Sequence, residues 1–295
     1  MKILITGSKG FIGSAAQIFF SREHFVHGCD IVESSEAGYT QINNKETLFN
    51  LIKEGSFDAV INAAGSANVG FSFVNPEKDY ELNTQHVQSL ASTVLECSPK
   101  TRIINFSSAA VYGNPKRLPI NEVDSPEPLS PYGNHKLQSE KVLRYFSDQF
   151  GLKTCSLRVF SAYGPGLKKQ LFWDIYTKWK SNPEVVLYGT GNESRDFIFI
   201  SDVLQSCSCI LERSEFKGEV LNVASGAEVK ISEAAEIFLS KLGAHSVKFS
   251  GEEKAGDPRN WCADISRLKL LGFMPQVDLA SGLERTANSY LQGLQ

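Results

Sequence analysis

The amino terminus combines a short apolar run with a turn that contains three glycines. The run Lys2-Ile3-Leu4-Ile5-Thr6 has the length of a buried strand, and an apolar helical pattern through residues 18–20 follows the turn. Glycines at positions 7, 10 and 13 permit a tight turn, close approach of the backbone to a pyrophosphate, and close packing of helix on strand. The start of the helix also offers amides to phosphate. These residues predict the first unit of a dinucleotide-binding α/β fold, with an ordinary strand-to-helix connection as the alternative.

The end of the second predicted strand distinguishes between these readings. Residues 25–30 form a strand pattern that ends in Asp30, where the hydroxyls of an adenosine ribose would lie. Lys9 complicates the choice of cofactor, because a cation in the glycine turn could receive a 2′-phosphate that Asp30 would repel. We predict NAD, with NADP as the alternative, and Lys9 is either a cofactor contact or a solvated surface residue.

Strand-like runs alternate with helical patterns along the chain, at residues 58–61, 102–106, 154–159 and 220–223. Alternation of this kind predicts a parallel sheet that is covered by helices on both faces, with ligands beyond the carboxyl ends of the strands. Asn62-Ala63-Ala64-Gly65 and Ser107-Ser108 begin where two strands end, so both segments should face the cofactor.

Beyond about Tyr163 the sequence changes to loops and shorter elements rich in Gly, Pro and aromatic residues. We therefore predict an α/β fold, a Rossmann-type doubly wound parallel sheet with a smaller C-terminal substrate-binding lobe. The NAD(P)-binding part would comprise residues 1–163 and about 197–223. The lobe would comprise residues 164–196 and 224–295.

A tyrosine and a lysine four residues apart lie on one face of a helix, and this spacing occurs three times. Gly113, Asn114 and Pro115 follow Tyr112 and break any helix before Lys116. Tyr176 with Lys180 belongs to an amphipathic helix pattern that buries its aromatics. Tyr132 with Lys136 opens a long helical pattern after Pro131. This third pair is the candidate for chemistry, because a nearby ammonium would lower the pKa of the phenol.

Composition narrows the class of protein further. The chain has 295 residues, 42% of them hydrophobic, and a net charge of −3, so no bulk cationic surface indicates nucleic acid. The opening apolar run is too short for a signal peptide, and no stretch reaches membrane-spanning length. The six cysteines are scattered without zinc-ligand spacing. We expect a cytoplasmic protein with reduced cysteines, no metal, no nucleic-acid partner and no membrane contact.

The order of these features resembles an extended short-chain dehydrogenase/reductase of the nucleotide-sugar epimerase and dehydratase group. The resemblance covers nearly the whole chain, and its landmarks appear in sequence: the glycine turn 7–13, Asp30, residues 62–65, Asn83, Ser107-Ser108, Tyr132 with Lys136, Tyr163-Gly164-Pro165-Gly166, Arg195-Asp196-Phe197, Asp202, Gly256-Asp257 and Ala263-Asp264-Ile265-Ser266. It implies NAD as cofactor, a nucleotide-diphosphate sugar as substrate, and a homodimer formed through the helices near residues 83–97 and 132–149.

The resemblance also implies roles for individual residues. Tyr132 would be the acid and base on the sugar hydroxyl, Lys136 would hold the nicotinamide ribose, and Ser108 would share a hydrogen bond with the same sugar oxygen. The residues expected to bind the cofactor are Gly7, Lys9, Gly10, Phe11, Ile12, Gly13, Asp30, Ile42, Asn43, Ala63, Ala64, Gly65, Asn83, Ser107, Tyr132 and Lys136. Those expected to bind the substrate are Ser108, Ser161, Arg195, Lys254 and Arg259. The three cations among them would bind its two phosphates.

Departures from the family pattern bear on the reaction. Ala109 and Ala110 stand where dehydratases place an acidic pair, which disfavours 4,6-dehydration. Ser161 replaces an asparagine that contacts phosphate, and Ile42-Asn43 replaces the Asp-hydrophobic pair that commonly reads adenine. The favoured prediction is C4 epimerisation through a 4-keto intermediate. Reduction of a 4-keto nucleotide sugar by NAD(P)H is the alternative, and a non-catalytic nucleotide-binding protein is the third hypothesis.

Overall fold

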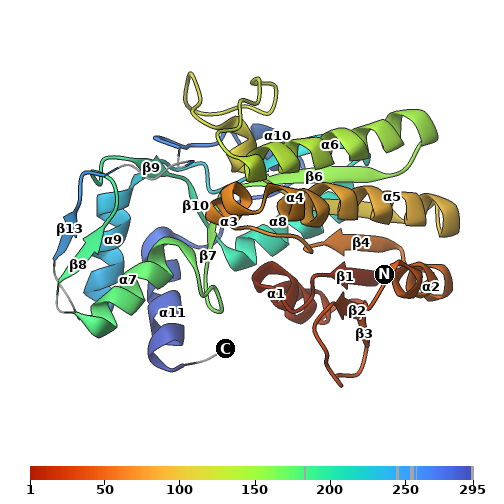
Figure 1. Ribbon diagram of the computed structural model, residues 1–295, viewed down its shortest axis with the longest axis horizontal. Helices are drawn as coiled ribbons and strands as arrows, with labels where there is room; N and C mark the ends of the chain where they lie inside the picture. The colour runs from red at the N-terminus through yellow and green to blue at the C-terminus, as the bar shows by residue number, and fades with distance from the viewer. Residues whose placement is uncertain (183, 244–245, 253–255, 257, 294–295) are drawn as a thin grey trace.

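The computed structural model describes residues 1–182, 184–243, 246–252, 256 and 258–293. Within these residues, seven strands form one sheet in the order β11-β6-β5-β4-β1-β2-β3, and all neighbouring strands run parallel (Figure 1). The strands are β1 (Lys2–Thr6), β2 (Phe25–Asp30), β3 (Tyr39–Gln41), β4 (Ala59–Asn62), β5 (Arg102–Ser108), β6 (Thr154–Val159) and β11 (Lys217–Val223). The predicted parallel sheet is confirmed, and β3 is an edge strand that the sequence pattern did not reveal.

Helices cover both faces of this sheet, as predicted. The covering helices are α1 (Phe11–Phe20) and α8 (Ile200–Arg213), which pack against each other on one face, and α2 (Lys45–Gly55), α5 (His86–Cys97) and α6 (Pro131–Phe150), which pack together on the other. Every residue of β4 and β6 is buried. Strand β4 therefore reads as a nearly continuous apolar run, whereas β6 alternates apolar residues with the buried polar side chains of Thr154, Ser156 and Arg158. The Rossmann-type doubly wound fold is therefore confirmed.

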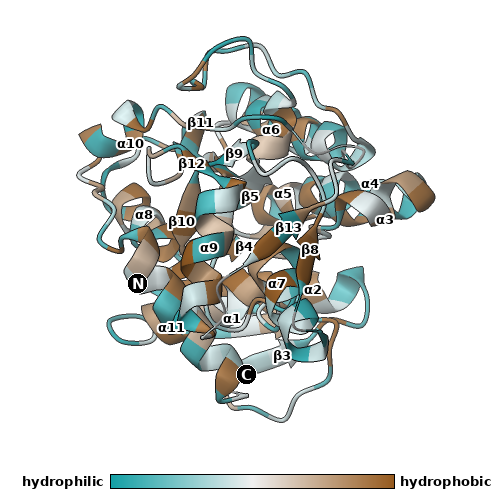
Figure 2. Ribbon diagram, turned by 90° about the vertical axis from the view of Figure 1, so that its left-hand side faces the viewer, coloured by the Kyte–Doolittle hydropathy of each residue, from teal (hydrophilic) through white to brown (hydrophobic). Residues whose placement is uncertain are grey.

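A second group of elements lies beside the sheet, at the left of Figure 1. It consists of the helices α7 (Gln170–Ser181), α9 (Ile231–Lys241) and α11 (Leu279–Leu291) and the short strands β7 (Ser161–Tyr163), β8 (Val185–Leu187), β9 (Ser194–Arg195), β10 (Phe197–Phe199), β12 (Val229–Lys230) and β13 (Val247–Phe249). Figure 2 looks onto this end of the molecule, where β8 and β10 are coloured as hydrophobic. Helix α10 (Ser266–Leu270) packs against β11 of the main sheet.

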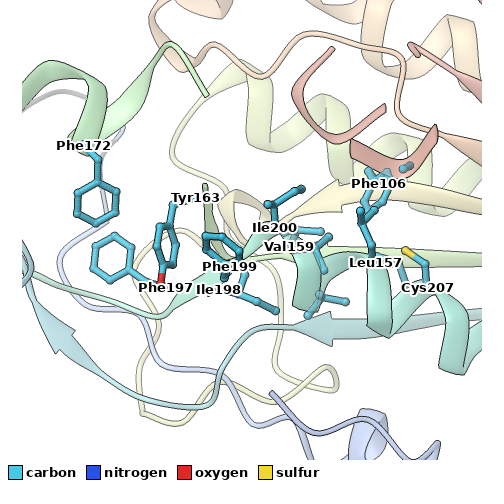
Figure 3. Close-up of a cluster of buried hydrophobic side chains, with 14 of the residues drawn as sticks. Phe106, Leu157, Val159, Tyr163, Phe172, Phe197, Ile198, Phe199, Ile200 and Cys207 are labelled. Carbon is cyan, nitrogen blue, oxygen red and sulfur yellow. The ribbon is translucent and has the colours of Figure 1, made fainter. Parts of the chain in front are cut away.

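Aromatic side chains join this group to the sheet. The ring of Tyr163 packs against the rings of Phe172, Phe197 and Phe199 at centroid distances of 5.4 to 6.2 Å. Figure 3 shows these rings continuing toward Leu157 and Phe106 of the sheet, and all of them belong to one buried cluster. The core thus runs without interruption from the sheet into the second group. The division of the chain into two lobes at the sequence-derived boundaries stays a prediction.

The chain between β4 and α5 is less regular than the sequence suggested. It forms α3 (Val69–Val74), α4 (Pro76–Tyr80) and then one turn of π-helix, η1 (Glu81–Gln85), which leads directly into α5. A single π-helical turn is rare and is frequently found at functional sites. The sequence predicted an ordinary helix from about residue 83 and missed this turn.

Candidate active site

The glycine turn between β1 and α1 is packed so tightly that larger residues would not fit. A Cβ atom on Gly13 would lie 2.1 Å from the carbonyl oxygen of Gly7, and one on Gly7 would lie 2.5 Å from the amide nitrogen of Ala64. Gly7 also has a φ of +68°, a left-handed conformation that glycine adopts without strain. Ala63 donates its amide to Thr6 at 3.0 Å, so the segment after β4 lies directly against the turn.

Helix α1 begins above this turn without a side-chain cap on its N-terminus, at Gly10. The first amides of a helix have no partner within the helix, so those of Phe11 and Ile12 point toward the carboxyl edge of the sheet. The structure therefore brings together the predicted glycines, Phe11, Ile12, Ala63 and Ala64 in one cradle that can receive a phosphate group.

Asp30 lies at the carboxyl end of β2 and is fixed by two main-chain amides. Its Oδ2 accepts the amide of Lys9 at 2.9 Å, and its Oδ1 accepts the amide of Ile31 at 2.7 Å. Carboxylate oxygens have further lone pairs, so these bonds orient the group without using all of its capacity. The amide of Ile42 donates to the carbonyl of Asp30 at 2.7 Å, while Asn43 is exposed beside it.

Lys9 does not extend into solvent, which corrects the surface reading of this residue. Its Nζ lies 2.7 Å from Oε1 of Glu36 and 4.8 Å from the centroid of the Tyr39 ring. Glu36 therefore already neutralises the cation that favoured a 2′-phosphate. The sequence could not show this pairing, because Lys9 precedes β2 in the chain and Glu36 follows it.

Tyr132 occupies the first turn of α6, and the local sequence explains why. Ser130 caps the helix by accepting the amide of Gly133 at 3.1 Å, and Pro131 occupies the first helical position. A Cβ on Gly133 would lie 2.6 Å from the carbonyl oxygen of Ala110, so only glycine lets α6 approach the end of β5 this closely. That approach brings the hydroxyl of Ser108 within hydrogen-bonding reach of the Tyr132 phenol.

Electrostatics at this pair differ from the sequence expectation. Burial raises the pKa of Tyr132 to about 12, although the hydrogen bond from Ser108 pulls it down in part. The predicted lowering is thus wrong, because removing a phenolate from water costs more than the neighbouring groups return. Burial also lowers the pKa of Lys136 to about 8, against the opposing effect of Asp79 and Glu140.

Lys136 lies below the Tyr132 ring, with its Nζ 6.0 Å from the ring centroid and 3.0 Å from the carbonyl oxygen of Phe106. A Cβ on Gly65 would lie 2.8 Å from Oδ1 of Asn83 and 3.4 Å from Nζ of Lys136, so these two side chains converge on Gly65. Within the described residues, both polar atoms of the fully buried Asn83 side chain lack a hydrogen-bond partner. Such an amide is satisfied only by a further group at the site.

Ser107 differs from its predicted role. Its hydroxyl donates to Glu140 at 2.5 Å, and Glu140 is paired with Arg158 at 2.7 Å in the same buried network. The Ser107 side chain therefore faces the core behind the site, and Ser108 alone of the two faces Tyr132.

The two other tyrosine and lysine pairs behave as predicted. Tyr112 ends a short 3-10 helix, η2 (Ala109–Tyr112), and its hydroxyl bonds to Asn222 at 2.6 Å. Tyr176 lies on α7, where its hydroxyl bonds to the carbonyl of Tyr290 at 2.9 Å. Both phenols are engaged within the core.

Of the predicted phosphate-binding cations, Arg195 on β9 contacts the backbone of the loop that carries Arg259. The guanidinium of Arg195 lies 3.3 Å from the carbonyl oxygen of Arg259 and 5.5 Å from the centroid of the Trp261 ring. Arg259 donates its amide to Asn114 at 2.8 Å, and Trp261 donates its indole N–H to Gly113 at 3.0 Å. Both bonds fasten the loop to the turn that follows Ser108.

Ser161 and Asp196 hold the neighbouring backbone in place. Ser161 is half-buried and donates its amide to Asp196 at 3.0 Å. Asp196 is fully buried and accepts amides from Ser225, Gly226 and Ala263. Lys254, the remaining predicted phosphate ligand, lies outside the described residues.

Sequence reasoning missed a buried acid and base beside the site. Asp79 on α4 is fully buried and contacts the ring of His135, which precedes Lys136 on α6. The available signal was the position of Asp79 four residues before Asn83 and of His135 beside Lys136.

The remaining candidate groups give no competing site within the described residues. None of the His, Cys, Asp and Glu side chains there forms a cluster that could hold a metal ion. No helix in the described part of the chain is long and apolar enough to cross a membrane. The six cysteines are free thiols, four of them buried.

Known proteins resemble this chain in sequence over its full length. A model of the family described as NAD dependent epimerase/dehydratase matches residues 3–224. A Bacillus subtilis protein named as an uncharacterized UDP-glucose epimerase is 29% identical, with 100% of this chain and 99% of that protein covered.

Solved structures also resemble this chain over its whole length. The UDP-glucose 4-epimerase of Thermotoga maritima, solved with UDP-glucose, is 25% identical with a TM-score of 0.91 and covers 100% of both chains. The UDP-glucuronic acid 4-epimerase of Bacillus cereus, in complex with UDP-glucuronic acid and NAD, is 26% identical with a TM-score of 0.88 and covers 99% of both chains.

Proposed function

The chain belongs to the NAD dependent epimerase/dehydratase family, and we propose that it is a C4 epimerase of a nucleotide-diphosphate sugar that acts through a 4-keto intermediate. The observation that carries this proposal is the convergence of Ser108, Tyr132 and Lys136 on one side of the buried Asn83. These side chains lie at the carboxyl edge of the sheet, where α/β enzymes bind their ligands.

The residues at this edge fit NAD. The cradle formed by Gly7, Gly10 and Gly13 leaves no room for side chains and suits a pyrophosphate, while Asp30 can accept both hydroxyls of a ribose. The unpartnered amide of Asn83 calls for a polar ligand group beside Lys136. Bound NAD would supply the chemistry of the reaction by taking a hydride from C4 of the sugar and returning it to the opposite face.

Three side chains would move or hold the proton in this reaction. Tyr132 would take the proton of the C4 hydroxyl as the carbon is oxidised and return it on reduction. Ser108, whose hydroxyl lies within hydrogen-bonding reach of the phenol, would hold the same sugar oxygen in line with it. Lys136 is held by the carbonyl of Phe106 and would place a positive charge beneath the phenol that favours its deprotonation.

The substrate would extend from Tyr132 toward Arg195 on β9 and the loop that carries Arg259. Forked guanidinium donors bind a diphosphate well, and Ser161 lies at the base of the same region. Ala109 and Ala110 provide no carboxylate beside Ser108, which supports epimerisation over 4,6-dehydration. The pairing of Lys9 with Glu36 supports NAD over NADP.

An isotope experiment with UDP-linked sugars tests this function. A substrate labelled with deuterium at C4 should give the C4 epimer with the label retained, with no net reduction of NAD, because the hydride returns to the sugar it left. Tyr132→Phe should lower kcat by about three to four orders of magnitude while NAD stays bound, because the proton acceptor is lost.

The matched control is Tyr176→Phe. Tyr176 also stands four residues before a lysine on a helix, but its hydroxyl donates to the carbonyl oxygen of Tyr290 within the core. This variant should keep full turnover and lose about 1 kcal/mol of stability. A product without the label, or equal losses in both variants, would refute the proposed mechanism.

We further propose that two copies pair through α5 and α6. A groove of about 580 Å³ lies between these helices, and Tyr145 and Phe150 beside it are 56% and 53% exposed. Large apolar side chains in contiguous exposed positions favour an interface with another chain. A cytoplasmic location remains a prediction, supported by six cysteines that are all free.

A further inference from the structure

The buried contact between Asp79 and His135 connects the two segments that carry the candidate active site. Oδ2 of Asp79 lies 2.7 Å from Nδ1 of His135, and the edge of the Tyr80 ring covers the imidazole at a centroid distance of 5.5 Å. Asp79 is completely buried and His135 is 8% exposed. Within the described part of the chain, the second carboxylate oxygen of Asp79 is buried without a hydrogen-bond partner. Such a group is costly to bury, so its retention calls for an explanation.

A second hydrogen bond, about one helical turn further along the chain, joins the same two segments. The hydroxyl of Thr84 donates to the carbonyl oxygen of His135 at 2.9 Å. Asp79 lies just before the π-helical turn that carries Asn83, Thr84 lies within this turn, and both bind the same residue of α6. His135 in turn stands between Tyr132 and Lys136 on that helix. The relative position of Asn83 and Lys136 is therefore set at His135.

We propose that Asp79 and His135 form a positioning pair for this site: they hold the π-helical turn of Asn83 against α6 and place the buried Asp79 carboxylate beside the helix that carries Tyr132 and Lys136. The inference rests on the proposed function only in naming Tyr132 as the group that titrates. It concerns two residues that do not touch the reacting atoms.

The charge of Asp79 acts on both members of the catalytic pair. It raises the pKa of Tyr132 and opposes the lowering of the pKa of Lys136 that burial causes. The other charged groups that face this pair are Glu140 on α6, which also supports the ammonium, and Lys169 before α7, which opposes it. On α5, burial and Lys136 together lower the pKa of His86. Among these groups of the described part of the chain, Asp79 alone affects the pKa of both Tyr132 and Lys136.

Two consequences follow for the phenol and for the cofactor. Without its negative charge, Asp79 would no longer oppose ionisation of Tyr132, so the phenol should ionise at lower pH. Without the contact to His135, the turn that carries Asn83 would lose one of its two ties to α6, so NAD should be held less tightly. Charge and contact can therefore be separated by substitution.

The test is a phenolate titration of the enzyme with NAD bound, which needs no sugar substrate. The absorbance of each protein is compared with that of its Tyr132→Phe counterpart, so that only Tyr132 contributes to the difference. Asp79→Asn keeps the shape and a hydrogen bond but removes the charge, and it should lower the midpoint of Tyr132 by about half to one pH unit. An unchanged midpoint would overturn the electrostatic part of the proposal.

The control for burial of a carboxylate is Asp202→Asn. Asp202 is also buried and accepts the amides of Gln276 and Val277. Asp202 and both partners are far from Tyr132 in the sequence. This variant should lose stability without moving the midpoint of Tyr132. If it moved the midpoint as much as Asp79→Asn does, a general loss of structure would explain both results and the inference would be wrong.

The positioning part is tested at His135, and this test stands if Asp79→Asn does not fold. His135→Ala keeps the charge of Asp79 but removes its partner, so the NAD retained per subunit after gel filtration should fall at least several-fold. His135→Asn places an amide nitrogen near the position of Nδ1 and should restore most of the retained NAD. Equal retention in His135→Ala and the unmodified protein, or no rescue by His135→Asn, would overturn the positioning role. Both readouts remain valid if the protein has no epimerase activity, so failure of the proposed function is recognised separately.

Discussion

Replacing Gly133 with alanine tests whether the close approach of α6 to β5 creates the catalytic grouping. Gly133 lies between Tyr132 and Lys136, and a Cβ there would stand 2.6 Å from the carbonyl oxygen of Ala110 and 3.1 Å from its carbonyl carbon. Both of these atoms belong to the backbone of the turn after Ser108, so they cannot rotate away as a side chain would.

The size of the effect follows from these distances. Carbon and carbonyl oxygen atoms rarely approach closer than about 3.3 Å, so α6 and the turn must separate by roughly 0.7 Å. Alanine gains about 1 kcal/mol over glycine within a helix, while overpacking costs about 1–3 kcal/mol, so the net loss of stability should be only about 0–2 kcal/mol. Catalysis is more sensitive, because displacement by about 1 Å can cost about 100-fold in rate. We expect the kcat of Gly133→Ala to fall about 10- to 100-fold.

The assay compares the kcat for epimerisation, the retained NAD and the melting temperature of Gly133→Ala with those of Gly70→Ala. Gly70 also lies within a helix, α3, but the nearest atom to its added Cβ would be 3.5 Å away, an ordinary contact. Gly70→Ala should keep its activity. Full turnover in Gly133→Ala, or an equal loss in Gly70→Ala, would refute the argument that this contact aligns Ser108 with Tyr132.

Three further predictions follow from individual contacts. Asp30→Ala combined with Glu36→Gln should raise the affinity for NADP relative to NAD by about 10-fold or more, because a repelling carboxylate is lost and Lys9 is released; calorimetric titration with both cofactors checks the ratio. Lys136 has a pKa of about 8 in the folded protein against 10.5 for the free group, so the unfolded chain binds more protons between these values and stability rises with pH there. Relative to Lys136→Met, the unfolding free energy of the unmodified protein should therefore increase by up to about 1.4 kcal/mol per unit from pH 8 to 10, as denaturant titrations would show; a flat difference contradicts the buried ammonium. Tyr145→Glu should give monomers in sedimentation equilibrium if α5 and α6 form the dimer interface, and a persistent dimer would place the interface elsewhere.

The sheet could be predicted from sequence because its strands are buried on both faces. Burial on both faces favours apolar residues at successive positions, as in residues 59–61, while residues 154–159 alternate polar with apolar side chains, which also indicates a strand. Both patterns are local, so both strands were recognisable without knowledge of their neighbours. The start of α6 was equally local, since Pro131 and the pattern after it are contiguous in the chain. The short edge strand β3 has neither property, because all three of its residues are only half-buried.

Side-chain electrostatics could not be predicted in the same way, because they depend on groups distant in sequence. The role of Lys9 changed when Glu36 was found beside its ammonium, and the role of Ser107 changed when its hydroxyl was found on Glu140. For Tyr132 the spacing to Lys136 was right, but the depth of burial set the direction of its pKa. Spacing identifies which groups can meet and does not give the solvent exposure that fixes their charge.

Asn83 illustrates how the two kinds of information combine. Asn83 was predicted to be a site residue from the order of landmarks in the chain. In an ordinary helix, however, an asparagine at this position would carry no special significance. The structure places it in a π-helical turn, buried, with both amide atoms unpartnered and aimed at the space shared by Gly65 and Lys136. A π-turn inserts one residue into the helical repeat and so changes the direction of the side chains that follow it. Because Asp79 just before this turn and Thr84 within it both bind His135, the irregularity is held by the same helix that carries Tyr132 and Lys136. The departure from regular helix that the sequence pattern concealed is therefore the feature that turns Asn83 toward Lys136.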